Sequence, residues 1–443
     1  MARLGSIYAL VWGECIRQWR PARHSTGWTG FRSSKVRVPD PPCDTTRDST
    51  DMKKTTAALS LIAGLLAGPA FADRGDDPAV IPHLDHVFLI MMENHAYGQI
   101  YGNPNAPFIN QMAQTASLAT NFFAVGHPSL TNYLEVVGGS NFGVINDHSP
   151  DWHNGSCTPN LISGIPSDES SPAPICPITG SGMDAPTPAV DTTNEGTPSA
   201  PVYNTPIPAA RTVGRTIADQ LVDARMSWKS YQEGIPASGA DGVNYSDGIF
   251  SNLSPAAITS TGSVQNLYAV KHNPFVYFAN VQGNSNSTNG LKNVVGFDGI
   301  DGFYADLRAG KAPNFSFIAP NQCHDMHGIG NGSPFCGYDP NPVLIQMGDA
   351  TVQQLVTAIR KSKAWEEGNN AIVVIWDEND YSSLPNQVVT IVETNYGVNG
   401  VSSNKPYNHF SLLKTLEAGF GLPCLNHACD DKVKVMSDLF RVR

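Results

Sequence analysis

Three apolar runs in the sequence have the length and composition of buried β-strands. They cover residues 86–92, 315–318 and 371–376. Each run is almost continuously apolar, without the alternation expected of a strand with one face in water. Each run ends in polar or charged residues. We therefore expect a sheet that is covered on both faces.

A helix is predicted between the second and third of these strands. Gly348 and Asp349 provide a start signal for it. The apolar positions that follow repeat at helical spacing and are Val352, Leu355, Val356 and Ile359. Strand, helix and strand in this order form a βαβ unit with parallel pairing. Further helices are predicted at 130–137, 211–225 and 409–420, so the pattern indicates an α/β fold with a largely parallel sheet.

The N-terminal part of the chain has the pattern of a bacterial secretory signal. Met52 is followed by two lysines, an apolar run at 57–66 and the sequence Ala70-Phe71-Ala72. A membrane-spanning helix is the alternative, but the run is well short of the roughly 20 residues that a span needs. We expect a signal peptide at 52–72 and a secreted or periplasmic protein. Residues 1–51 are then a mis-set translation start or, alternatively, a functional leader.

Residues 73–443 are expected to form one large α/β domain with an insertion. Pro, Ser, Thr and Gly dominate the segment 154–208, where little helical or strand periodicity is visible. This composition predicts a long surface excursion, which would shape the entrance of a site.

The chain is acidic, with a formal net charge of −11. Residues 1–72 carry ten Lys and Arg and five Asp and Glu, so residues 73–443 carry 18 basic and 34 acidic side chains, a net charge of −16. Such a surface repels nucleic acids and anionic membranes. No apolar stretch beyond the signal indicates stable membrane insertion. A small phosphate ester would need a locally positive site, which a metal ion could supply.

Six cysteines follow the signal, and they form three pairs that are close in sequence. The pairs are Cys157 with Cys176, Cys323 with Cys336, and Cys424 with Cys429. In an exported chain we expect three disulfides. A zinc site is the competing interpretation, but no C-x-x-C pair is present.

Two of the predicted strands end in oxygen-bearing side chains. Glu93 and Asn94 follow the first strand, and Asp377 and Glu378 follow the last one. Ligands of open α/β sheets bind at the carboxyl ends of the strands. Oxygen ligands suit Mg²⁺, Mn²⁺ or Ca²⁺, and Zn²⁺ is a further candidate. For each pair taken alone a solvated strand end is the favoured interpretation, but two pairs at equivalent strand ends favour a metal site.

Two further clusters could carry chemistry. Ser129 lies at the start of a predicted helix, where free N–H groups stabilise a phosphate, although a simple helix cap is the alternative. His324, Asp325 and His327 follow a strand and could hold a metal, bind phosphate oxygens or protonate a leaving group. His409, at the start of the last predicted helix, is another candidate.

Five motifs in sequence order resemble the bacterial phosphoesterase family of acid phosphatases and phospholipases C. They extend over about 350 residues, from Asp85 to near Phe440. The motifs are Met92-Glu93-Asn94-His95, His127 to Leu134, Pro320-Asn321 with Cys323, Asp325 and His327, Trp376-Asp377-Glu378, and Tyr407 to Glu417. The resemblance implies an alkaline-phosphatase-like domain with three α/β/α layers.

The resemblance also implies roles for individual residues. Ser129 takes the position of the nucleophile. The metal-ligand positions fall on Glu93, Asn94, Asp377 and Glu378, and the positions that contact phosphate or the leaving group fall among His127, His324, His327 and His409. Asn379-Asp380 departs from the acidic or histidine run that family members often have there. This departure leaves open which of the two preceding acids binds metal.

The function expected from these observations is a secreted, metal-dependent acid phosphatase that hydrolyses phosphate monoesters through Ser129. Histidines that are charged below about pH 6.5 would favour activity at acid pH. A phospholipase C that cleaves phospholipid head groups is the alternative enzyme. A non-catalytic protein that binds phosphorylated ligands is the alternative from another class.

Overall fold

The computed structural model describes much of the chain after residue 80. The described residues are 81–144, 146–150, 175–179, 181–182, 212–235, 238–239, 267–283, 288–329, 336–337, 342–382 and 385–441. All of them belong to one compact unit, Asp73–Arg443. The predicted leader 1–51, the signal peptide 52–72, Cys157 and most of the segment 154–208 lie outside the described residues.

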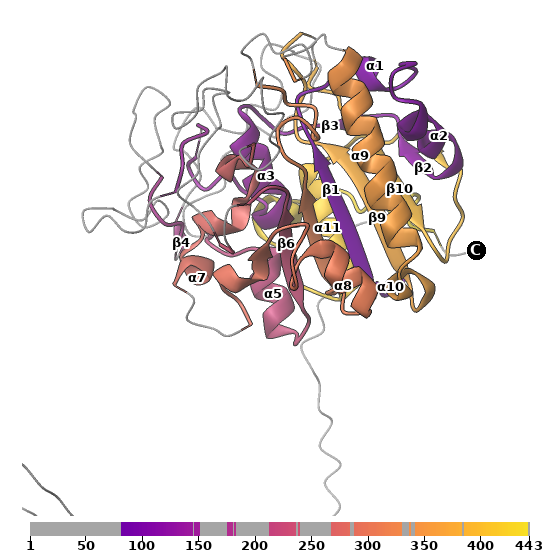
Figure 1. The fold of residues 1–443 in the computed structure, drawn as a ribbon. Helices are drawn as coiled ribbons and strands as arrows, with labels where there is room; N and C mark the ends of the chain where they lie inside the picture. The colour runs from indigo at the N-terminus through magenta and orange to yellow at the C-terminus, as the bar shows by residue number, and fades with distance from the viewer. Residues whose placement is uncertain are drawn as a thin grey trace, which may run out of the picture. The chain divides into compact units, whose positions relative to one another are not determined.

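An eight-stranded sheet forms the centre of this unit (Figure 1). Its strand order is β11-β2-β10-β9-β1-β8-β6-β7. The strands are β1 His86–Met92, β2 Ser117–Ala119, β6 Trp228–Gln232, β7 Val294–Val295, β8 Phe315–Ala319, β9 Asn370–Trp376, β10 Thr390–Thr394 and β11 Ser402–Ser403. The five strands from β9 to β7 are parallel, whereas β10 is antiparallel to both its neighbours.

The three predicted strands are the central ones. All seven residues of β9 and the last six of β1 are buried, and their Val, Ile, Phe and Trp side chains suit a pleated surface packed on both sides. β1 lies between β8 and β9, with Leu89 opposite Phe317 on one side and Val373 on the other. The predicted βαβ unit is therefore parallel, but β8 and β9 pair with β1 and not with each other.

Helices cover both faces of the sheet. On one face, α9 Pro342–Arg360 contacts α2 Pro107–Thr115, α8 Phe303–Ala309 and α10 Lys363–Glu366. The second group comprises α3 Ser129–Gly138, α5 Ile217–Asp223 and α11 His409–Phe420. Figure 1 shows α9 on the near face of the sheet and α11 on the far face. The predicted α/β class, with three layers and a largely parallel sheet, is confirmed.

Short elements complete the described structure. They are α1 Tyr97–Ile100, α7 Ala279–Gln282, β3 Phe122–Phe123, β4 Ser181–Gly182, β5 Thr212–Val213, β12 Tyr407–Asn408, η2 Val270–His272, η3 Pro274–Tyr277, η4 Leu291–Asn293 and η5 Asn426–Cys429. The helix predicted at 211–225 is shorter than expected, because Thr216 and Asp219 start α5 with a capping box. Among the described helices, none has both the length and the apolar character needed to cross a bilayer.

The start predicted for α9 is wrong. The helix begins at Pro342, so Gly348 and Asp349 lie inside it. The Asp349 carboxylate instead accepts hydrogen bonds from the backbone N–H groups of Phe108 (3.2 Å) and Ile109 (2.8 Å), in the first turn of α2. A residue with the chemistry of a cap thus caps a neighbouring helix, because the unpaired N–H groups at a helix start donate to any acceptor within reach.

Two of the three predicted disulfides lie within the described residues. Cys323 is bonded to Cys336 and Cys424 to Cys429, with Cα atoms 5.3 and 5.2 Å apart. These two pairings are confirmed. The first bridge closes the loop that follows β8, and this loop carries part of the candidate site described next.

Candidate active site

Glu93, Asn94 and Asp377 meet at the carboxyl ends of β1 and β9. The backbone N–H of Asp377 donates to Met92 O (2.9 Å), and the N–H of Asn94 donates to the Asp377 carboxylate at Oδ1 (3.1 Å). Asn94 has a left-handed backbone (φ 51°), a conformation that Asn tolerates and that turns the chain sharply at the end of the strand. The two predicted acid pairs therefore lie together, as expected for neighbouring parallel strands.

The loop after β8 joins this edge from the other side of β1. The N–H of Glu93 donates to Asp325 O (2.8 Å), and the Asp325 carboxylate accepts from the N–H of His327 (2.7 Å). Glu93 and Asp325 are fully buried. Three adjacent strands thus deliver acidic side chains to one place.

Ser129 is the first residue of α3 and is 1% exposed. Its hydroxyl donates to Glu93 Oε2 (3.1 Å) and also lies 3.4 Å from Glu378 Oε1. The N-cap position belongs to Pro128, and no side chain caps the helix from there. The hydroxyl of Ser129 therefore points to the acid cluster and does not serve as the helix cap.

Lys271 and His272 complete the cluster, and sequence reasoning missed both. They lie in η2, a short turn in an otherwise apolar stretch, and both are about 2% exposed or less. The ammonium of Lys271 donates to Ser129 Oγ (3.3 Å). Two adjacent titratable residues inside an apolar run need partners if they are buried, and this was the signal available in the sequence.

His272 lies between two carboxylates. Its Nε2 is 3.0 Å from Glu93 Oε1 and its Nδ1 is 3.0 Å from Asp325 Oδ2, while its ring stacks on Tyr133 at 5.2 Å between centroids. Burial alone would lower the pKa of His272, but the two carboxylates raise it to about 9. The two carboxylates thus favour the charged imidazolium form of His272.

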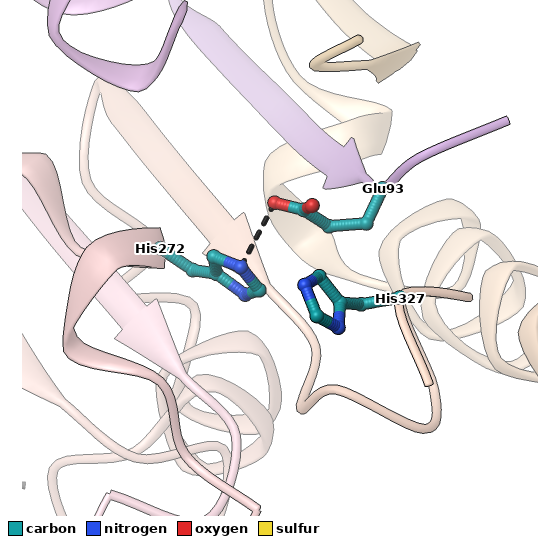
Figure 2. A group of neighbouring side chains, drawn as sticks. All are labelled: Glu93, His272 and His327. Atoms are coloured by element: carbon teal, nitrogen blue, oxygen red, sulfur yellow. Dashed lines mark ion pairs between the residues drawn. The ribbon is translucent and has the colours of Figure 1, made fainter. Parts of the chain in front are cut away.

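His327 has the opposite electrostatics. Its Nδ1 donates to Gly328 O (2.6 Å), and its Nε2 is 3.2 Å from the Lys271 ammonium. Burial and the charge of Lys271 lower the pKa of His327 to about 3. The expectation that His327 is charged at mildly acid pH is therefore wrong, because a neighbouring cation and burial both oppose its protonation. Figure 2 shows His272 and His327 turned toward Glu93 at the end of β1.

The acids of the cluster are buried from water. Burial and the neighbouring Glu93 raise the pKa of Asp377, and burial with the charges of Asp147 and Glu93 raises the pKa of Glu378. Burial acts in the same direction on Glu93, but the His272 cation outweighs it and lowers the pKa of Glu93. Within the described residues, Asp377 Oδ2 and Asn94 Oδ1 are buried and accept no hydrogen bond. Oxygen atoms of this kind are suited to a hard divalent cation.

A second set of donor atoms could also hold a metal. Ligand atoms of Glu93, His272 and His327 lie within 4.8 Å of one another. However, both ring nitrogens of His272 face carboxylates, Nε2 facing Glu93 and Nδ1 facing Asp325. His272 would have to give up one of these contacts to bind a cation, whereas Asp377 Oδ2 and Asn94 Oδ1 accept no hydrogen bond among the described residues, so the oxygen set fits a cation better.

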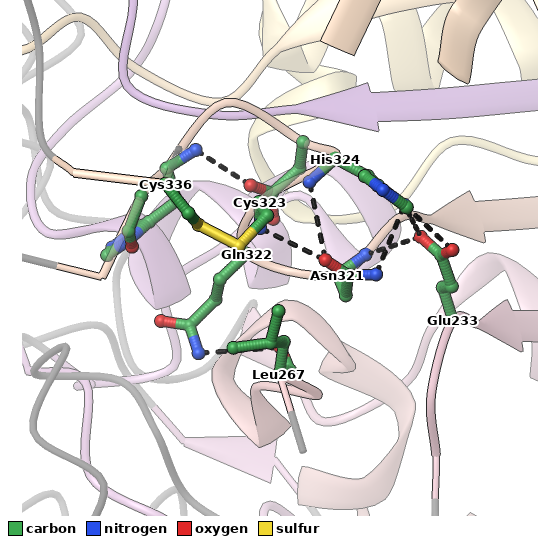
Figure 3. The surroundings of a disulfide bond; sticks show 10 residues. Glu233, Leu267, Asn321, Gln322, Cys323, His324 and Cys336 are labelled. Atoms are coloured by element: carbon green, nitrogen blue, oxygen red, sulfur yellow. Dashed lines mark hydrogen bonds and ion pairs between the residues drawn. A yellow bond between two sulfur atoms is a disulfide. The ribbon is translucent and has the colours of Figure 1, made fainter. Parts of the chain in front are cut away.

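The other predicted histidines fall in different places. His127 Nδ1 is 2.8 Å from Glu378 Oε2, and its ring stacks on Tyr381 at 3.9 Å, so it borders the cluster. His324 turns instead to Glu233 (2.8 Å), as Figure 3 shows beside the Cys323 bridge. His409 Nε2 donates to the backbone O of Asp377 (2.6 Å), and burial lowers the pKa of His409 to about 4. His409 thus holds the backbone of Asp377 as a neutral ring.

Comparison with known proteins gives the family. A sequence model of the phosphoesterase family matches residues 100–423, most of the chain. The chain belongs to the phosphoesterase family. This assignment confirms the predicted resemblance and the predicted enzyme class, a hydrolase of phosphoric esters. Glu93 and Asn94 lie just before the matched range.

Individual relatives are distant. The chain is 25% identical over 389 residues to a phosphatidylinositol-3-phosphatase of Mycobacterium tuberculosis, covering 86% of this chain and 93% of that one. It is 25% identical to a phosphate-repressible acid phosphatase of Penicillium chrysogenum over 72% of its length, but spans only 55% of the fungal protein. A solved structure of a Vibrio parahaemolyticus protein in the alkaline phosphatase superfamily is 12% identical to this chain in sequence, with a TM-score of 0.42. The match covers 81% of this chain and 75% of that one.

Proposed function

We propose that this phosphoesterase is an exported, metal-dependent acid phosphatase that hydrolyses phosphate monoesters with Ser129 as the nucleophile. The observation that carries the proposal is the position of the Ser129 hydroxyl. It lies between carboxylates of Glu93 and Glu378, at 3.1 and 3.4 Å, and the Lys271 ammonium, at 3.3 Å. An adjacent proton acceptor activates a serine hydroxyl for attack, and nearby positive charge stabilises its deprotonated form.

The metal would be held by Glu93, Asn94, Asp377 and Glu378. When bound, a divalent cation would offset the buried negative charge, lower the pKa of a nearby hydroxyl and polarise a phosphate oxygen. The oxygen donors favour Mg²⁺, Mn²⁺ or Ca²⁺ over Zn²⁺.

The chain's own residues account for the first proton transfer. As the bond from Ser129 Oγ to phosphorus forms, its proton passes to a carboxylate that it already contacts. Glu93 Oε2 (3.1 Å) and Glu378 Oε1 (3.4 Å) are the carboxylate oxygens within reach of Ser129 Oγ, and either accepts the proton in its ionised form. The ester bond breaks with the phosphoryl group on Ser129, and the leaving alkoxide takes a proton from water. Water then displaces phosphate from Ser129.

The substrate class rests on the named relatives. The Mycobacterium tuberculosis relative is named for a phosphate monoester on a lipid, and the Penicillium relative is named an acid phosphatase. We propose small phosphate monoesters as substrates. Export is supported by the predicted signal at 52–72 and by the bridges Cys323–Cys336 and Cys424–Cys429, since disulfides persist in oxidising compartments.

Ser129→Ala tests the nucleophile. We expect turnover of p-nitrophenyl phosphate to fall by roughly 10⁴-fold or more, and acid quenching of the wild type to trap phosphoserine. Ser362→Ala is a matched control, because the Ser362 side chain caps α10 by accepting from the N–H of Trp365. This control should lose about 1 kcal/mol of stability and keep its turnover. Near-normal turnover in Ser129→Ala would rule out the covalent mechanism.

A substrate panel separates the alternatives. It compares p-nitrophenyl phosphate, phosphatidylinositol 3-phosphate, bis(p-nitrophenyl) phosphate and phosphatidylcholine, each with and without a chelator. We expect the monoesters to be hydrolysed and the chelator to abolish the reaction. Faster cleavage of phosphatidylcholine would indicate a phospholipase C. Phosphate binding without turnover of any ester would indicate a binding protein.

A further inference from the structure

Asp147 bridges two donors beside the proposed nucleophile. Its Oδ1 accepts from the backbone N–H of Leu130 (3.0 Å), in the first turn of α3, and its Oδ2 lies 2.9 Å from the ammonium of Lys271. One carboxylate therefore satisfies a helix N-terminal N–H and a buried cation at the same time.

Lys271 is placed for more than this ion pair. Its side chain is 2% exposed, and its ammonium also lies 3.3 Å from Ser129 Oγ and 3.2 Å from His327 Nε2. In a phosphoryl group transferred to Ser129, the non-bridging oxygens are bonded to the same phosphorus atom as Oγ and so lie two bonds from it. A donor that already contacts Oγ is therefore within hydrogen-bonding reach of such an oxygen, at about 2.7–3.2 Å.

Asp147 differs from the other acids of the cluster. The side chains of Glu93 and Glu378 are 0% and 3% exposed, whereas that of Asp147 is 22% exposed. Those two acids come from strand ends, whereas Asp147 comes from the segment 146–150, which carries no helix or strand. Of these three acids, Asp147 is therefore the one whose carboxylate can turn away from the site into solvent.

We propose that Lys271, with the N–H of Leu130, binds a non-bridging oxygen of the phosphoryl group, and that Asp147 is the internal anion that fills this place until substrate displaces it. The inference rests on the proposed function of Ser129. A carboxylate and a phosphoryl oxygen carry the same sign of charge and use the same donors, so both cannot occupy them together. Phosphate can bind only to molecules in which Asp147 has left the subsite. The apparent affinity for phosphate is therefore the intrinsic affinity multiplied by the fraction of such molecules.

The test measures inorganic phosphate, as a ligand by calorimetry and as a competitive inhibitor of p-nitrophenyl phosphate hydrolysis. Asp147→Asn should tighten phosphate binding by about threefold to tenfold, because a neutral amide competes less well for the ammonium. Lys271→Met should weaken phosphate binding and lower kcat. In the Lys271→Met background, Asp147→Asn should have little further effect, since the two residues act through one contact.

Two further variants keep the test decisive. Asp223→Asn removes an acidic charge from an exposed pair with Arg215 and should leave phosphate binding unchanged, which controls for net charge. Asp147→Ser provides a second substitution if Asp147→Asn folds poorly. Unchanged or weaker phosphate binding in folded Asp147 variants overturns the inference, because Asp147 would then only hold Lys271 in place. Failure of the proposed function is distinguishable, since calorimetry reads phosphate binding even if the wild type turns over no ester.

Discussion

Gly348 supports the candidate site from behind, through Met326. Met326 is fully buried and lies between Asp325 and His327, with a left-handed backbone (φ 81°). A Cβ placed on Gly348 would overlap Cγ and Cε of Met326 and lie 3.1 Å from its Sδ. Because Cγ is only one bond from the Met326 Cβ, rotating the end of the side chain does not relieve the overlap. Gly348→Ala should therefore push the loop that carries Asp325 and His327.

Two opposing effects determine how much Gly348→Ala changes the free energy of unfolding. Alanine in a helix interior gains about 1 kcal/mol over glycine, whereas overpacking a buried contact costs about 1–3 kcal/mol. The free energy of unfolding should thus fall by about 0–2 kcal/mol, which lowers Tm by only a few degrees. Catalysis is more sensitive, since a shift of about 1 Å in a site can cost about 100-fold in rate. We expect Gly348→Ala to lose about tenfold to 100-fold in kcat while remaining folded.

Calorimetric Tm and kcat for p-nitrophenyl phosphate should be measured on the same preparations. Ala350→Gly is the matched control, because Ala350 is an exposed residue of the same helix and its change should cost about 1 kcal/mol without affecting kcat. Adding Met326→Ala to Gly348→Ala removes the overlapping atoms and should restore part of the lost kcat. A wild-type kcat together with a raised Tm in Gly348→Ala would refute the reasoning.

The remaining predictions concern a cap, a histidine and the metal. Asp349→Ala should cost about 1 kcal/mol and speed amide exchange at the start of α2, with kcat unchanged; unaltered exchange would contradict the cap. His324→Ala should keep kcat within a few-fold of wild type, whereas His327→Ala should not, and equal losses would contradict the placement of His324. Removing the metal with a chelator should lower Tm, and returning a divalent cation at about 100 times its Kd should restore about 2.7 kcal/mol. A Tm insensitive to both would argue against a bound ion.

The central sheet and the acids at its edge could be predicted because each depends on local pattern. A continuous apolar run defines β1 or β9, and the residue after its last apolar position is fixed at the strand end. Glu93 and Asp377 therefore follow from sequence alone. The order of the strands in the sheet does not follow from the sequence, because the position of β1 between β8 and β9 depends on long-range packing.

The contacts of the histidines could not be predicted from the sequence, for a geometric reason. His324 and His327 are three residues apart in a turn without regular period, so sequence could not show that one faces Glu233 and the other Lys271. His272 lies in a 3-10 turn whose residues show no periodicity, and its two carboxylate partners are far away in the chain. Asp349 carried a real capping signal, but the helix that it caps is set by tertiary contact.

The arrangement of β9, β1 and β8 also makes the enzyme's chemistry a property of the complete sheet. The carboxylates around Ser129, those of Glu93 and Glu378, follow the ends of β1 and β9, which are distant in sequence and meet only through long crossover connections. No short fragment of the chain contains enough of them to bind a phosphate ester, and a collapsed chain with native helices but unpaired central strands would contain none of them assembled. During refolding, activity should thus return only with the slow, non-local strand pairing. Turnover is in this sense a direct reporter of native topology, and it should lag behind the recovery of helical signal.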